Sequence, residues 1–114
     1  MSQPIFHIVG HRHWQAACEL GSYAPESLAA EGFVHFSYAD QVARTANARF
    51  ADQDGLIVVE FDPARLAAPV VDEDLYGAGE LFPHVYGAIP TAAATGSHQL
   101  VREPTGQYAF DGGR

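Results

Sequence analysis

Three histidines stand in short apolar segments that are typical of β-strands: His7 in IFHIV, His35 in GFVHFS and His84 in LFPHVYG. Burying an imidazole costs free energy unless both ring nitrogens find hydrogen-bond partners. Three such positions in one small chain therefore favour a shared polar cleft. The alternative is that each histidine is a core or edge residue with satisfied hydrogen bonds.

A hydroxyl stands two residues after the second of these histidines. Ser37 and His35 belong to the same predicted strand and project from one of its faces, because strand side chains alternate. A hydroxyl beside an imidazole could serve as a nucleophile with its base. No Gly-x-Ser-x-Gly elbow surrounds Ser37, and its alternative role is to cap the helix that follows.

The segment around the third histidine adds an acid and two aromatic rings. Glu80 follows a glycine-rich stretch, and its carboxylate could stabilise positive charge on a substrate sugar or act as a base. Phe82 and Tyr86 flank His84, and Tyr86 shares its strand face and could stack on a flat ligand. The alternatives are a solvated loop glutamate and an ordinary core or edge tyrosine.

A metal site is the other chemistry that six histidines bring to mind. His11 and His13 would converge only on extended chain, since on a helix they point about 200° apart. No cysteine or carboxylate completes a recognised zinc pattern, so no metal is expected. We expect Cys18 to pack on the apolar side of the first helix.

Helices and strands that would position these residues follow each other without a regular βαβ rhythm. The pattern favours a single α+β domain with a strongly bent or split sheet and two main helices. In the helix after Ser37, Ala39, Val42, Ala46 and Phe50 follow helical spacing. We expect strands at residues 5–9, 32–37, 56–61, 69–72, 81–88 and 98–102, and helices at 14–20 and 39–50.

Composition narrows the class of protein further. The 114 residues include 6 Lys+Arg and 14 Asp+Glu, a formal net charge of −8, which disfavours nucleic-acid binding. One cysteine cannot form an internal disulfide, and no signal peptide or membrane span is recognisable. We expect a small acidic, soluble, cytoplasmic protein with its domain over residues 1–102 and a loose polar tail over 103–114.

Taken together, IFHIV, EGFVHFS, GLIVVEFDPARL and GELFPHVYGAIP resemble the bacterial domain-of-unknown-function 952 family over residues 4–102. The resemblance implies a fold similar to the ADP-ribosyltransferase-like superfamily, a split sheet around a central cleft that binds NAD in active members. A more distant likeness is to the RNA 2′-phosphotransferases. By these likenesses His7 matches a ribose contact on the first strand, and His35 with Ser37 matches a middle-strand motif.

The chain departs from those relatives at two points. Neither Glu80 nor His84 lies in a clear match to the usual late glutamate motif, and the arginines used by RNA phosphotransferases are not evident. RNA is therefore a doubtful substrate.

The leading hypothesis is an NAD- or nucleotide-using transferase that acts at a ribose anomeric carbon. Its predicted catalytic residues are Glu80, His84 and His35, and its predicted ligand-binding residues are His7, Ser37, Phe82 and Tyr86. One alternative is a non-catalytic nucleotide or small-molecule binding module that keeps the cleft without the chemistry. A metal-dependent hydrolase is a third interpretation, and the oligomeric state is left open.

Overall fold

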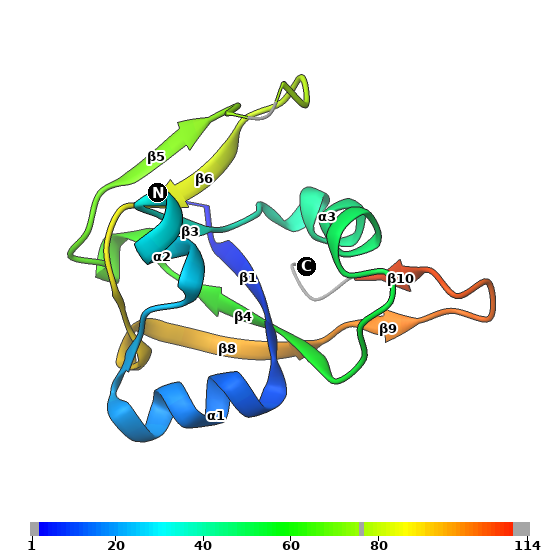
Figure 1. Cartoon of the computed structure of the whole chain (residues 1–114), viewed down its shortest axis with the longest axis horizontal. Helices are drawn as coiled ribbons and strands as arrows, with labels where there is room; N and C mark the ends of the chain where they lie inside the picture. Colours follow the sequence, from blue (N-terminus) through cyan, green and yellow to red (C-terminus); the bar gives the residue numbers. More distant parts are fainter. Residues whose placement is uncertain (1–2, 76, 111–114) are drawn as a thin grey trace.

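The strand with the strongest sequence signal lies in the middle of a sheet. The apolar, β-branched run of β4 (Leu56–Phe61) pairs antiparallel with β1 (Ile5–Gly10) on one side and with β8 (Ala94–Gln99) on the other. The computed structural model describes residues 3–75 and 77–110, and Figure 1 shows this sheet with α1 running beside it. The expected strand at 56–61 is confirmed.

A second three-stranded antiparallel sheet carries the other histidine segments. In it β6 (Phe82–Val85) lies between β3 (Val34–His35) and β5 (Val70–Glu73). A single antiparallel bridge between Phe6 and Ser37 connects β1 to the chain just after β3. The fold is thus α+β, with antiparallel sheets that meet at one bridge.

Shorter elements complete the described chain. Two further strand pairs are small: β2 with β7 and β9 with β10. The α-helices are α1 (His11–Leu20), α2 (Glu26–Glu31) and α3 (Val42–Arg49). The remaining strands are β2 (Ser22–Tyr23), β7 (Ile89–Pro90), β9 (Val101–Arg102) and β10 (Tyr108–Ala109), and the 3₁₀ turns are Ala39–Gln41, Pro63–Arg65 and Thr91–Ala93.

Helix boundaries follow the local chemistry. Gly21 and Gly32 end α1 and α2 with φ of 83° and 87°, a left-handed conformation that glycine adopts without strain. The end of α1 at Leu20 agrees with the expected helix at 14–20, whereas α2 was not expected. It lies in a stretch that begins at a proline and spans less than two turns, too short for a clear periodic signal.

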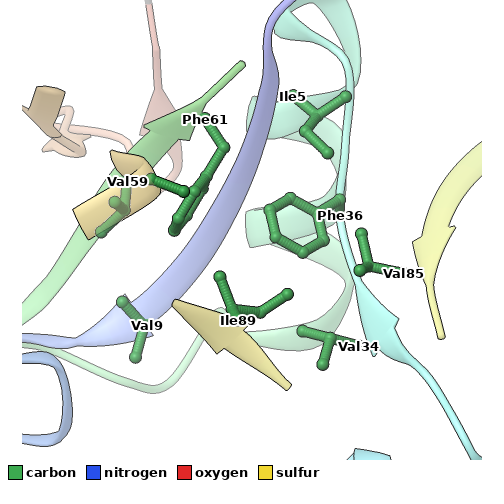
Figure 2. Packing of buried hydrophobic residues seen from close by; sticks show 9 residues of the cluster. Ile5, Val9, Val34, Phe36, Val59, Phe61, Val85 and Ile89 are labelled. Atoms are coloured by element: carbon green, nitrogen blue, oxygen red, sulfur yellow. The ribbon is translucent and has the colours of Figure 1, made fainter. Parts of the chain in front are cut away.

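Apolar side chains from both three-stranded sheets form one core. Figure 2 shows side chains from β1, β3 and β4 turned toward one another, with Phe36 and Ile89 among them. The buried members of this cluster are Ile5, Val9, Val34, Phe36, Val59, Phe61, Val85, Ile89 and Ala93. A second cluster lies under α3 and is formed by Phe6, Ile8, Val42, Ala46, Val58 and Tyr108.

Three expectations about this architecture are wrong. Cys18 is exposed, because the buried face of α1 carries Ala17 instead. Ser37 does not cap the following helix: its hydroxyl donates to Thr45 Oγ1 at 3.3 Å, and the amide of Tyr38 is bonded by the side chain of Gln41.

The chain beyond residue 102 is the third correction. Residues 103–110 are not loose, because β10 pairs with β9 and buries Tyr108 against α3. The expectation for 111–114 lies outside the described residues, and the domain limit at residue 102 stays a prediction.

Candidate functional site

A pocket of about 550 Å³ is lined by residues of β1 and of the segment after β3, including the bridged pair Phe6 and Ser37. Its wall also includes residues of α3 and of the segment that leads into β6. Six of the seven residues selected from the sequence line it: His7, His35, Ser37, Glu80, Phe82 and His84. Tyr86 is not among the lining residues. A second hollow of about 590 Å³, near Tyr38 and Val70, contains none of the seven.

His7 has both ring nitrogens engaged inside the protein. Nδ1 lies 2.6 Å from the carbonyl oxygen of His35 and Nε2 lies 2.7 Å from the hydroxyl of Tyr23. Since a carbonyl only accepts, Nδ1 carries the hydrogen and Nε2 accepts from Tyr23. Burial lowers the pKa of His7 to about 4, so the ring is neutral near pH 7, and burial raises the pKa of Tyr23 to about 12.

His35 and Ser37 both line the pocket, but their side chains hydrogen-bond to residues of different helices. His35 Nε2 lies 2.9 Å from Glu31 of α2, while Ser37 donates to Thr45 of α3. Burial lowers the pKa of His35, and the Glu31 carboxylate opposes that change. The hydroxyl–imidazole pair suggested by the sequence spacing is therefore not formed.

His84 is the most deeply buried of the three imidazoles, at 1% exposure. Its Nδ1 lies 2.9 Å from Glu73 Oε1, and its ring stacks on Phe33 with centroids 4.1 Å apart. The hydroxyl of Tyr86 donates to the same Glu73 oxygen. These two hydrogen bonds, that of Tyr86 first, lower the pKa of Glu73 and keep its carboxylate ionised.

Glu80 is held by two side chains from the start of α3. Arg44 contacts both of its carboxylate oxygens, and Gln41 Nε2 donates to Oε1 at 2.9 Å and to the carbonyl of Leu81 at 2.8 Å. The bond from Arg44, and then that from Gln41, lower the pKa of Glu80. The pocket therefore has an ionised carboxylate whose charge is balanced by an adjacent guanidinium.

Comparison with known proteins assigns the chain to a family. The model of a family described as "Protein of unknown function (DUF952)" matches residues 8–97. The chain belongs to the DUF952 family. A search of curated proteins found no match for this DUF952 chain.

Solved structures of one bacterial protein share the DUF952 chain's fold. The crystal structure of protein CC0527 from Caulobacter crescentus superposes with a TM-score of 0.82 at 26% identity, covering 94% of each chain. Its solution NMR structure gives a TM-score of 0.71 at 24% identity, covering 91% of this chain and 90% of that one.

Several pocket residues of this DUF952 chain were not found by sequence reasoning. The pocket is also lined by Tyr23, His13 and the α3 arginines Arg44 and Arg49. Glu73, which does not line the pocket, hydrogen-bonds to His84. Tyr23 belongs to a strand of two residues, which is too short to give a periodic signal in the sequence. The arginines lie on the wetter side of their helix, where helical periodicity alone does not separate a solvated side chain from one at a pocket rim.

The histidines that the sequence left undecided fall on different surfaces. Both lie on α1, and His13 lines the pocket whereas His11 does not. Among residues 3–75 and 77–110, no group of three or more His, Cys, Asp or Glu side chains is arranged to hold a metal ion. Within the same residues, no helix is long and apolar enough to cross a membrane.

Proposed function

We propose that the pocket binds a nucleotide, with NAD as the first candidate, and that the protein is a transferase acting at a ribose anomeric carbon. The observation that carries the proposal is the pocket's lining, which includes four imidazoles, the carboxylates of Glu26 and Glu80, and two of the chain's six arginines, in a protein of net charge −8. Guanidinium groups suit phosphate oxygens, and imidazoles and hydroxyls suit sugar hydroxyls. A volume of about 550 Å³ is within the range of small-molecule sites.

We further propose that the fold is ADP-ribosyltransferase-like. Support comes from the division of the β-structure into β1-β4-β8 and β3-β6-β5, joined by the Phe6–Ser37 bridge, with the pocket beginning beside that bridge. This division supports the proposal because the sequence resemblance implies a split sheet.

The proposed chemistry breaks the bond between the ribose anomeric carbon and nicotinamide. The bonding electron pair passes to the pyridinium nitrogen, neutralising its charge, while the sugar develops positive charge. Glu80 would stabilise that charge, since its lowered pKa keeps it ionised at neutral pH. Tyr23, oriented by His7, and His35 would hold ribose hydroxyls, and Phe82 would pack against a ring.

A second candidate, a binding module without chemistry, is favoured by one observation. Both oxygens of Glu80 already accept hydrogen bonds from Arg44, and Gln41 adds a third. A carboxylate with a guanidinium on it has less charge to offer a sugar cation. Both candidate functions involve binding of the same nucleotide, and they differ in whether the protein then cleaves it.

Calorimetric titration with NAD tests the shared claim. We expect saturable binding that Arg49→Ala weakens by roughly tenfold, the loss typical of one charge-assisted hydrogen bond. Arg65→Ala is the matched control, because Arg65 is an exposed arginine that does not line the pocket. Absence of heat and of thermal stabilisation at millimolar NAD would remove the nucleotide claim.

Mass spectrometry of the products separates the two candidates. A transferase or its hydrolytic side reaction releases nicotinamide from NAD, whereas a binding module returns NAD unchanged. We expect nicotinamide release by the wild-type protein, abolished by Glu80→Ala. NAD binding without nicotinamide release would exclude the transferase and leave the binding module as the function.

A further inference from the structure

We infer that His84 is the general base of the proposed transfer and that Glu73 is its positioning residue. This role differs from charge stabilisation at the sugar, and it rests on the function proposed above. It assigns the acceptor half of the reaction, the activation of a hydroxyl-bearing acceptor such as an alcohol or water, to one end of the pocket.

The hydrogen bonds of Glu73 determine which nitrogen of His84 is protonated. An ionised carboxylate only accepts, and Glu73 Oε1 lies 2.9 Å from His84 Nδ1 while also receiving the hydroxyl of Tyr86. Nδ1 must therefore carry the hydrogen. In the neutral ring Nε2 then holds the lone pair, which is the state that a general base needs.

The hydrogen bond to Glu73 leaves Nε2 of His84, a pocket-lining residue, available to a bound acceptor. Among the described residues, every fully buried side-chain nitrogen or oxygen has a hydrogen-bond partner, and the contacts of His84 use Nδ1 alone. Nε2 is therefore not completely buried, although His84 as a whole is only 1% exposed. His84 is also one of the residues that line the pocket. Stacking on Phe33 at 4.1 Å fixes the plane of the ring.

The other histidines near the pocket are less suited to this task. His7 uses both nitrogens, on the His35 carbonyl and on Tyr23. His35 directs Nε2 to Glu31. Since the hydroxyl of Ser37 donates to Thr45, the base is not coupled to a serine nucleophile, and its proton must come from a bound acceptor.

The step balances without any further reactant. The acceptor O–H gives its proton to His84 Nε2 as the oxygen bonds to the ribose anomeric carbon. The bond from that carbon to nicotinamide breaks with its electron pair on the pyridinium nitrogen. Neutral nicotinamide leaves, and the imidazolium, stabilised by the Glu73 carboxylate, later returns the proton to solvent.

The first measurement reads the tautomer directly. Long-range ¹H–¹⁵N NMR of the ligand-free protein distinguishes a protonated from an unprotonated ring nitrogen. We expect the Nδ1–H form of His84 in the wild type and a shift toward Nε2–H in Glu73→Ala. Glu60→Ala is the matched control, because Glu60 bonds His98 at 2.7 Å in an equivalent pair that does not line the pocket.

The second measurement is nicotinamide release from NAD by the same proteins. We expect Glu73→Ala and His84→Gln to lower kcat by about 10²-fold or more, the usual contribution of a positioned acid or base, with KM for NAD little changed. Glu60→Ala should keep wild-type kcat. Glu73→Gln preserves the side-chain volume and replaces Glu73→Ala in the measurement if that variant does not fold. We expect the same decrease in kcat.

The outcomes separate this inference from the proposed function. Nε2–H in the wild type, or full turnover in folded Glu73→Ala or His84→Gln, overturns the base role while NAD binding and transfer stand. NAD binding without turnover in the wild type overturns both the base role and the transferase. Failure of NAD to bind removes the proposed function itself, and the base role with it.

Discussion

At the scale of single residues, His7 shows how a buried imidazole is kept neutral. It lies on β1 beside the rings of Tyr23 and Phe36, and both of its nitrogens are bonded. Protonating Nε2 would break the hydrogen bond that it accepts from the Tyr23 hydroxyl, and it would place a charge where water has little access. Burial therefore lowers the pKa of His7 from 6.5 to about 4.

This shift makes folding stability depend on pH. Between the two pKa values the unfolded chain binds a proton that the folded chain does not, so stability is complete above about pH 6.5 and falls as the pH drops toward about 4. The loss attributable to His7 is about 2 kcal/mol at pH 5 and about 3 kcal/mol by pH 4. Urea unfolding of the wild type and of His7→Gln at several pH values measures it.

The free-energy difference between the two proteins should shrink as the pH falls. His11→Gln is the control for the substitution itself, because His11 is exposed on α1. An equal pH dependence of the wild type and His7→Gln would show that His7 is not held neutral in the folded protein.

Sequence patterns located the histidines but did not give their hydrogen-bond partners. Alternation along a strand placed His35 and Ser37 on one face, and both do line the pocket. It could not show that Thr45 would take the hydroxyl or that Glu31 and Glu73 would take the rings, since those partners come from other elements. Such contacts depend on tertiary packing, which local periodicity does not contain.

At the scale of elements, long apolar runs were predicted well and short elements were not. The strands at 5–9 and 56–61 and the burial of Val42 and Ala46 agree with the structure. In contrast α2, β2 and β10 span only two to six residues each. Elements of this length are stabilised by what they pack on, so their sequences carry little periodic signal of their own.

The β9–β10 hairpin is an element held by polar contacts from distant segments. Asn47 of α3 accepts from the amide of Tyr108 at 2.7 Å and donates to its carbonyl at 3.1 Å. The guanidinium of Arg102 lies 4.1 Å from the centre of the Tyr108 ring and donates to the carbonyls of Ala51 and Gln53. The polar composition of residues 103–110 concealed this docking.

Asn47→Ala should therefore loosen the hairpin more than the sheet. We expect a loss of about 1–3 kcal/mol in unfolding free energy, because the backbone groups of Tyr108 lose both partners. Amide hydrogen exchange should accelerate at residues 101–109 while β4 stays protected. Gln107→Ala, at an exposed position of the same hairpin, is the control, and uniform acceleration across the chain would contradict local docking.

At the scale of the whole molecule, the chain has an excess of acidic residues, whereas its pocket is lined by two arginines. The net charge is −8, yet Arg44 and Arg49 of α3 both line the pocket. The negative surface disfavours long polyanions, whose phosphates must contact many points of the surface, whereas a small nucleotide needs only the local guanidinium groups. The same charge distribution thus separates a nucleotide site from a nucleic-acid site.

This argument predicts that the protein does not bind RNA. The chain has only six Lys+Arg against fourteen Asp+Glu, so few positive side chains are present to neutralise a phosphate chain. Fluorescence anisotropy of a labelled single-stranded RNA should stay unchanged across a titration at low salt, where electrostatic binding is strongest. A saturable rise that weakens with added salt would contradict the prediction. It would also restore the RNA phosphotransferases as a guide to the substrate.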